Sequence, residues 1–148
     1  MTLWLRFRHG EAEGFGVLEG DSIAVHRGEM FGHAAPIGDA LPRDAVALLP
    51  PVRPGVFIGL WNNFGDAAAK QGLARPEVPL WFVKSPRALS GPDAPIPLPA
   101  GYAGRVVYEG ELGLVIGRRC ARATEEEAAG AIFGLTCVND VTALDTLT

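Results

Sequence analysis

The sequence predicts a mainly β fold with a few short helices. Glycine and proline, 19 and 12 residues, make up about a fifth of the 148-residue chain against roughly 12% in average usage, and they are spread out as turns. Between them lie short apolar runs, many of them β-branched, with little long helical periodicity. A hydrophobic content of 48% is enough to bury a core and excludes general disorder.

The N-terminal segment predicts a small β-meander. Residues 3–8 alternate apolar with polar side chains, which is the period of a strand with two different faces. Residues 14–18 and 22–26 are short apolar runs on either side of Glu19-Gly20-Asp21, so they predict a hairpin with a glycine-containing turn.

A linker is expected after the meander. Residues 34–55 are rich in Ala, Pro and Asp, and three prolines close the stretch. Proline has no backbone N–H to donate to a sheet, so we expect a linker with at most one short helical turn. The predicted division is an N-terminal unit, residues 1–55, and a second unit, residues 56–148.

The second unit begins with strands and a helix in alternation. Residues 56–60 and 80–84 are compact apolar runs that predict strands. The Ala-rich stretch 62–72 between them favours a helix that ends at Gly72. Residues 85–101 are too rich in proline for a helix or a sheet and predict a long loop.

The strongest local patterns come last. Residues 105–117 are apolar and partly β-branched, and they predict one long strand. Thr124 with Glu127 three residues later matches a capping box, so a helix is expected from Thr124 as far as Phe133. Residues 135–141 predict a final strand.

Composition also narrows the function class. A net charge of −4 and a pI near 5.3 argue against a nucleic-acid partner, which requires a basic surface. No apolar run is long enough to span a membrane, and charges interrupt the N-terminal apolar stretch where a secretory signal would need none. Two cysteines are too few for a disulfide scaffold, so a cytoplasmic protein is expected.

Two acidic residues stand out inside the predicted strand 105–117. Glu109 and Glu111 are two residues apart, so both carboxylates would point to the same face of a strand. On an enclosed face two like charges repel strongly, and a hard divalent cation would relieve the repulsion. On an open face the pair is simply solvated.

A third acid, Asp140, ends the next predicted strand. Alone it is either a turn residue or a metal ligand; with Glu109 and Glu111 it completes a plausible three-carboxylate site for Mg²⁺, Mn²⁺ or Ca²⁺.

In these residues the sequence resembles the fumarylacetoacetate hydrolase family from about Val56 onward. The resemblance is carried by Lys84-Ser85-Pro86, by Tyr108-Glu109-Gly110-Glu111-Leu112, and by Gly134 to Thr142 with its Asn139-Asp140-Val141-Thr142 ending. It implies a mixed β-sandwich roll that usually dimerises, with Glu109, Glu111 and Asp140 as ligands of Mg²⁺ or a similar ion. Lys84 resembles the family's lysine before the Pro-rich loop, where it either serves the site or salt-bridges its strand.

The resemblance implies a metal-dependent enzyme that hydrolyses, decarboxylates or isomerises 2-oxo or β-diketo carboxylic acids, mostly in the breakdown of aromatic compounds. The N-terminal β-segment is similar to the branch of 2-hydroxyhepta-2,4-diene-1,7-dioate isomerases and 5-carboxymethyl-2-oxo-hex-3-ene-1,7-dioate decarboxylases. The expected partner is a small 2-oxo acid, with neither nucleic acid nor membrane.

The sequence departs from the family pattern at the lid helix. Members commonly carry Gly-Leu-Asn-Tyr-x-x-His-x-x-Glu, whose His-Glu pair acts as general base. The ungapped alignment puts Gly65 and Ala68 at these two positions, and a shifted alignment puts Ala67 and Lys70 there. Asp66 is the acid-base group nearby, either a substitute base or an exposed helix residue.

The second departure is length. The chain stops eight residues after Asp140, where the family domain normally continues with further strands. We therefore expect open sheet edges and a protein that is a fragment or is completed by another chain, as a homodimer or larger assembly. Two hypotheses follow: a metal-dependent enzyme, or a catalytically inactive metal-binding relative that needs a partner.

Overall fold

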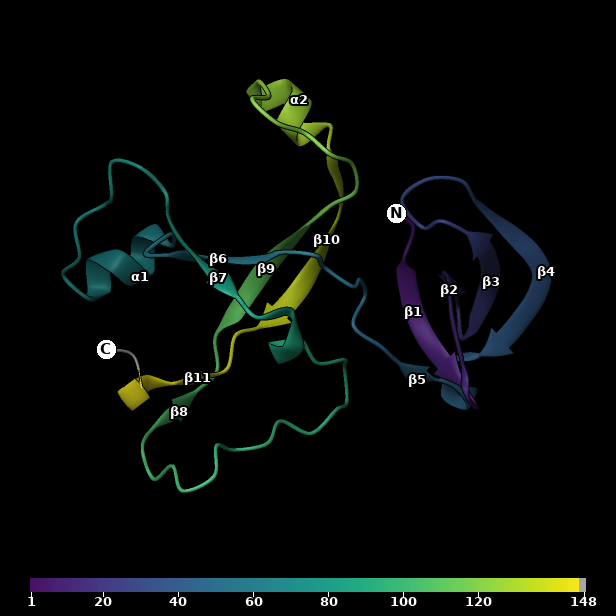
Figure 1. The fold of residues 1–148 in the computed structure, drawn as a ribbon, viewed down its shortest axis with the longest axis horizontal. Coiled ribbons are helices and arrows are strands. Elements are labelled where there is room, and N and C mark those ends of the chain that lie inside the picture. The colour runs from purple at the N-terminus through teal and green to yellow at the C-terminus, as the bar shows by residue number, and fades with distance from the viewer. Residues whose placement is uncertain (147–148) are drawn as a thin grey trace.

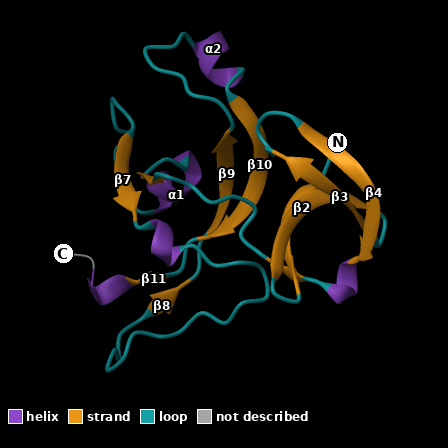
Figure 2. Ribbon diagram, turned by 45° about the vertical axis from the view of Figure 1, so that its right-hand side comes forward, coloured by secondary structure: helices purple, strands orange, loops and turns teal. Residues whose placement is uncertain are grey.

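The structure, a computed structural model, describes residues 1–146. Its N-terminal part is one antiparallel sheet in the spatial order β4-β3-β2-β1-β5. Figure 2 shows that this sheet is strongly curved. The strands are β1 (Trp4–His9), β2 (Ala12–Glu19), β3 (Ser22–Gly28), β4 (Ala34–Pro42) and β5 (Ala47–Leu48), with a 3₁₀ turn, η1 (Arg43–Ala45), before β5.

The curved sheet encloses a small hydrophobic core. Phe7, Ile23 and Val46 are buried, and apolar side chains from all five strands pack around them. This core confirms the meander expected from the alternation of residues 3–8 and from the hairpin at Gly20, whose φ of +61° suits glycine.

The expected linker over residues 34–55 is wrong in its first half. Residues 34–42 form β4, which pairs with β3 at both of its ends with a register shift between them, and β5 adds two residues to β1. β4 was not predicted from the sequence because its residues lack alternating β-branched side chains and include Pro36 and Pro42. As an edge strand, β4 needs partners on one side only, so prolines are tolerated there. The predicted helical turn is present as η1.

The second part of the chain is built from short paired strands. Within the described residues it holds three two-stranded sheets, which pair β6 with β7, β9 with β10 and β8 with β11. Figure 1 shows these elements to one side of the curved N-terminal sheet. The strands are β6 (Phe57–Trp61), β7 (Leu80–Lys84), β8 (Val106–Val107), β9 (Gly110–Ile116), β10 (Ile132–Asn139) and β11 (Thr142–Ala143).

Short helical elements connect these strands. The α-helices are α1 (Gly65–Lys70) and α2 (Glu125–Ala129), and the 3₁₀ turns are η2 (Pro86–Ala88) and η3 (Leu144–Thr146). Apart from η2, the Pro-rich segment 85–101 is the irregular loop that the sequence predicts. No helix within residues 1–146 has the length and apolar character needed to cross a membrane.

Two predicted elements differ most from the observed ones in their bounds. The single strand expected over residues 105–117 is divided into β8 and β9, with Tyr108 and Glu109 between them. The helix expected to reach Phe133 ends at Ala129, because Gly130 caps it and Ile132 already pairs with Ile116 of β9. The spacing of Ile132 and Phe133 was compatible with a helix or a strand. Pairing with β9 makes this segment a strand.

The capping box at the start of α2 is confirmed. Thr124 Oγ1 accepts a hydrogen bond from the Glu127 N–H at 3.2 Å, and a Glu127 carboxylate oxygen accepts one from the Thr124 N–H at 2.8 Å.

Because the cap is exposed and the helix is short, we expect Thr124→Ala to lower the free energy of unfolding by about 1 kcal/mol. Urea denaturation followed by circular dichroism measures this change. A loss above about 2 kcal/mol would show that Thr124 does more than cap the helix.

The β9–β10 sheet is open on one face. Leu112, Leu114 and Ile116 are each more than half exposed, whereas Glu111 and Val115 point to the other, less exposed face. Such alternation is the side-chain pattern of a strand with two different faces. At one end of the exposed face Phe133 contacts the N-terminal part of the chain, with its ring centroid 4.8 Å from that of Phe31.

Candidate active site

The β9–β10 pair carries the acidic residues predicted as metal ligands. Glu111 lies in β9 opposite Val138 of β10, and Asp140 follows the last residue of β10. The Asp140 N–H donates a hydrogen bond to the Glu109 carbonyl oxygen at 2.8 Å, which extends the ladder by one residue. Backbone pairing therefore holds the three acids at one end of this sheet, although Glu109 is not in a strand.

Lys84, the last residue of β7, reaches the same place. Its Nζ donates to Asp140 Oδ1 at 2.6 Å, and the two side chains are 24% and 11% exposed. The ammonium also lies 5.4 Å from the ring centroid of Phe82. This salt bridge joins β7 to a predicted metal ligand and is compatible with either role considered for Lys84.

Glu111 experiences the charges of both other acids. Partial burial raises the pKa of its carboxyl group above the usual value, and the negative charges of Asp140 and then Glu109 raise it further, while Lys84 acts in the opposite direction. The carboxylates of Asp140 and Glu109 therefore lie close enough to Glu111 for their charges to act on it. A positive charge among them would favour the ionised form of Glu111.

A cavity of about 390 Å³ lies beside this cluster, between α1 and the start of β9. Asp66 of α1 lines it together with Glu109 and Glu111, so the structure brings three of the five predicted site residues to one cavity. Lys84 and Asp140 do not line it; they lie next to Glu111 through the ion pair and the charge interaction.

Phe64 and Lys70 also line this cavity, and the sequence did not mark either as a site residue. One signal was available for Lys70. It follows Asp66 by four residues on a predicted helix, and that spacing places two side chains on the same face.

The three acids of the cluster are suited to a divalent cation by their chemistry but not by their present spacing. Within residues 1–146, no three His, Cys, Asp or Glu side chains stand close enough together to hold a metal ion as they are arranged. The chemistry of the cluster nevertheless fits a hard cation, because its three acids offer only oxygen ligands and repel one another without a positive charge. The ammonium of Lys84 provides that charge at Asp140.

The histidines are far from this cavity in the fold. His9 and His26 belong to β1 and β3 of the N-terminal sheet, and His33 precedes β4. None of the three lines the cavity between α1 and β9. Besides Glu109 and Glu111, the titratable residues that line the cavity are Asp66 and Lys70, both in α1.

Both parts of the chain match models of known protein families. Residues 56–148 match the family model described as fumarylacetoacetate (FAA) hydrolase C-terminal, and residues 3–51 match the one described as Rv2993c-like, N-terminal. An uncharacterized protein of Archaeoglobus fulgidus is 44% identical over 108 residues, which are 73% of this chain and 43% of that protein. The chain thus spans about half the length of such relatives.

Two solved structures resemble nearly the whole chain. The 5-carboxymethyl-2-hydroxymuconate delta-isomerase from Mycobacterium smegmatis matches with a TM-score of 0.85 at 33% identity, over 98% of this chain and 56% of that one. The 2-hydroxyhepta-2,4-diene-1,7-dioate isomerase from Mycobacterium marinum matches with a TM-score of 0.80 at 28% identity and the same coverage.

These similarities confirm the mainly β fold of the fumarylacetoacetate hydrolase type, whose sheets are not closed in residues 1–146. The family model covers more than half of the chain, including α1, β9 and β10, which carry the acidic cluster and the cavity. The chain belongs to the fumarylacetoacetate hydrolase family.

Proposed function

We propose that this chain provides the acidic site of a divalent-metal-dependent enzyme that acts on 2-oxo or β-diketo carboxylic acids in the breakdown of aromatic compounds. The observation that carries the proposal is the grouping of Glu109, Glu111 and Asp66 around one cavity, with Asp140 and Lys84 beside it. The two isomerases that share its fold, named for dicarboxylic acid substrates, support the substrate class.

Glu109, Glu111 and Asp140 would hold the cation, with Mg²⁺ as the expected ion and Mn²⁺ or Ca²⁺ as alternatives. Bound there, such an ion supplies Lewis-acid stabilisation for negative charge that develops on a 2-oxo carboxylate. Lys84 keeps the Asp140 carboxylate at the end of β10 through its 2.6 Å ion pair. The cavity next to these acids is large enough for a small organic acid.

Asp66 is the proposed proton-transfer residue. In decarboxylation of a 3-carboxy-2-oxo acid, the bond between C3 and the carboxylate carbon breaks and CO₂ leaves. The electron pair of the broken bond moves toward the 2-oxo oxygen. A proton then returns to C3, and Asp66 or water can supply it. Hydrolysis of a carbon–carbon bond additionally requires a general base, because water must first be activated. General-base help is typically worth about 10²–10⁴-fold in rate.

We therefore expect decarboxylation or tautomerisation to exceed hydrolysis in this chain, and Asp66→Asn to reduce any hydrolysis about 10²–10⁴-fold. The experiment supplies oxaloacetate and acetylpyruvate with Mg²⁺ and compares rates with those of Mg²⁺ alone. Asp39→Asn, at an exposed position in β4, is the matched control. Efficient acetylpyruvate hydrolysis that Asp66→Asn leaves unchanged would show that the base lies elsewhere.

A second candidate is a catalytically inactive metal-binding relative that needs a partner chain. It is favoured by the residues of the lid helix, where Gly65 and Ala68 stand at the expected positions of the family's His-Glu pair. Cation binding without turnover of either substrate would support this second candidate.

The exposed apolar face formed by Leu112, Leu114 and Ile116 supports the proposed assembly with a second copy of the chain.

A further inference from the structure

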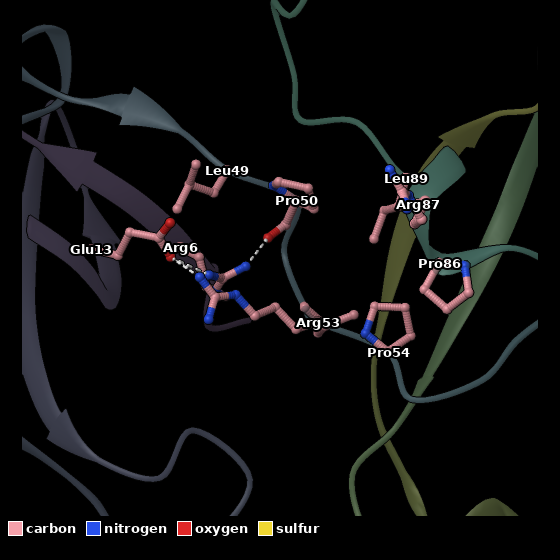
Figure 3. Close-up of a pocket in the computed structure, with 10 residues that line it drawn as sticks. Arg6, Glu13, Leu49, Pro50, Arg53, Pro54, Pro86, Arg87 and Leu89 are labelled. Atoms are coloured by element: carbon pink, nitrogen blue, oxygen red, sulfur yellow. Dashed lines mark hydrogen bonds and ion pairs between the residues drawn. The ribbon is translucent and has the colours of Figure 1, made fainter. Parts of the chain in front are cut away.

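A second cavity, of about 350 Å³, lies between the N-terminal sheet and the segment that follows β7. Figure 3 shows Arg6 and Glu13 on one side of it, Pro86, Arg87 and Leu89 on the other, and the segment 49–54 running between the two sides. It shares no lining residue with the cavity beside Glu111. Its walls come from both regions that match family models.

Positive charge exceeds negative charge around this cavity. Three arginines line it, Arg6, Arg53 and Arg87, with Glu13 as the one acidic lining residue. Arg6 donates to Glu13 Oε2 at 2.8 Å, and Arg53 donates to the same oxygen. Arg87 has no ion-pair partner within residues 1–146. Glu13 is thus the one carboxylate beside three guanidinium groups and pairs with two of them, which leaves a net charge of about +2 at the cavity.

The guanidinium groups also have unused hydrogen-bond donors. Arg6 donates to Glu13 and, at 3.1 Å, to the Pro50 carbonyl oxygen, while among residues 1–146 Arg53 donates only to Glu13. Each guanidinium carries five N–H donors in a planar fork suited to carboxylates. Burial and the neighbouring charge of Arg53 lower the pKa of Arg6, and Glu13 offsets this only in part. A second anion would relieve the repulsion between the arginines.

The remaining lining of this cavity is apolar. The other lining residues are Leu49, Pro50, Val52, Pro54, Pro86 and Leu89. A volume of about 350 Å³ lies at the lower end of the range of small-molecule sites, roughly 300–1,000 Å³. Apolar walls with a few guanidinium groups suit a molecule that has an apolar body and one anionic end.

We propose that this cavity binds a small organic acid, with its carboxylate on Arg53 and Arg87 and its apolar body against the proline and leucine side chains. Such a ligand would contact the N-terminal sheet, the segment 49–54 and the loop after β7 at the same time. It would thereby hold the N-terminal part against the part that carries the acidic site. The site is independent of the proposed reaction.

Calorimetric titration of the 148-residue chain with benzoate at low ionic strength tests the proposal. Benzamide, which keeps the ring and removes the charge, is the uncharged comparison, and inorganic phosphate is the anion without an apolar body. We expect benzoate to bind and both comparison molecules to bind at least about tenfold more weakly, since a charge-assisted hydrogen bond typically contributes that much or more. Benzamide or phosphate binding as tightly as benzoate would overturn the proposal.

Substitutions of the lining residues test whether benzoate binds at this cavity. Arg53→Gln and Arg87→Gln, both exposed positions, should each weaken benzoate binding about tenfold, while Arg75→Gln, an exposed arginine away from the cavity, should leave it unchanged. Glu13→Gln removes the competing carboxylate and should strengthen binding, which keeps the test decisive if an arginine variant folds poorly. Equal affinity in all four variants, or no benzoate binding in the original chain, would refute the site.

Discussion

Glu111→Gln is expected to abolish the binding of Mg²⁺ or Mn²⁺. The Glu111 carboxyl group interacts with the charges of both other acids in the cluster. The substitution keeps the shape of the side chain but removes one of three negative charges and one carboxylate ligand, on which hard divalent cations depend. Isothermal titration calorimetry with each ion measures the loss.

Glu77→Gln is the matched control for this experiment. Glu77 is exposed and lines neither cavity, so its variant should bind the cation as the original chain does. Unchanged affinity in a folded Glu111→Gln variant would refute the three-carboxylate site. Loss of affinity in both variants would mean that overall negative charge, and not the cluster, attracts the ion.

Lys84→Met is expected to destabilise the metal-free chain and to increase its response to Mg²⁺. Without the ammonium group, the Asp140 carboxylate loses its ion-pair partner at 11% exposure, beside Glu111. Exposed ion pairs contribute up to about 1 kcal/mol, and breaking a fully buried pair costs about 3–5 kcal/mol. For this half-buried pair we expect a loss of about 2 kcal/mol in the free energy of unfolding.

Added Mg²⁺ should recover part of that loss. In the variant no positive side chain competes for Asp140, so the cation meets a more negative cluster and stabilises the folded state by mass action. Thermal unfolding with and without Mg²⁺ should therefore show a larger increase in Tm for Lys84→Met than for the original chain. An equal increase would show that Lys84 does not compete with the cation.

Lys70→Met controls for the loss of a lysine. It removes the same charge from an exposed helix position that makes no ion pair within residues 1–146, and it should change the free energy of unfolding by less than about 0.5 kcal/mol. A loss as large as that of Lys84→Met would attribute the destabilisation to net charge and not to the pair with Asp140.

Local sequence patterns predicted the elements that depend on local interactions. The alternation in residues 3–8 became β1, and Thr124 with Glu127 became the capping box of α2, because both signals are complete within a few residues. The residues from Tyr108 to Leu112 and from Gly134 to Thr142 carried the family resemblance, which the match over residues 56–148 confirms.

Elements that depend on a distant partner were predicted less well. β4 is a strand because β3 offers it backbone hydrogen bonds, although its own residues, including Pro36 and Pro42, resemble a linker. Phe133 joined β10 and not α2 because the strand pairs with β9 from Ile132 onward. Pairing energy came from other parts of the chain, and it outweighed the local preferences.

The sequence by itself determined which acids are candidates for the site: Glu109 and Glu111 by their spacing, Asp140 by its place at the end of a strand. Only the tertiary structure decided what surrounds them. It placed Asp66 of α1 across a cavity from both glutamates and brought Lys84, 56 residues away in sequence, to Asp140. Side chains so distant in sequence come into contact only when the sheets and the helix pack together. Local sequence patterns therefore do not predict which charged side chains lie next to one another.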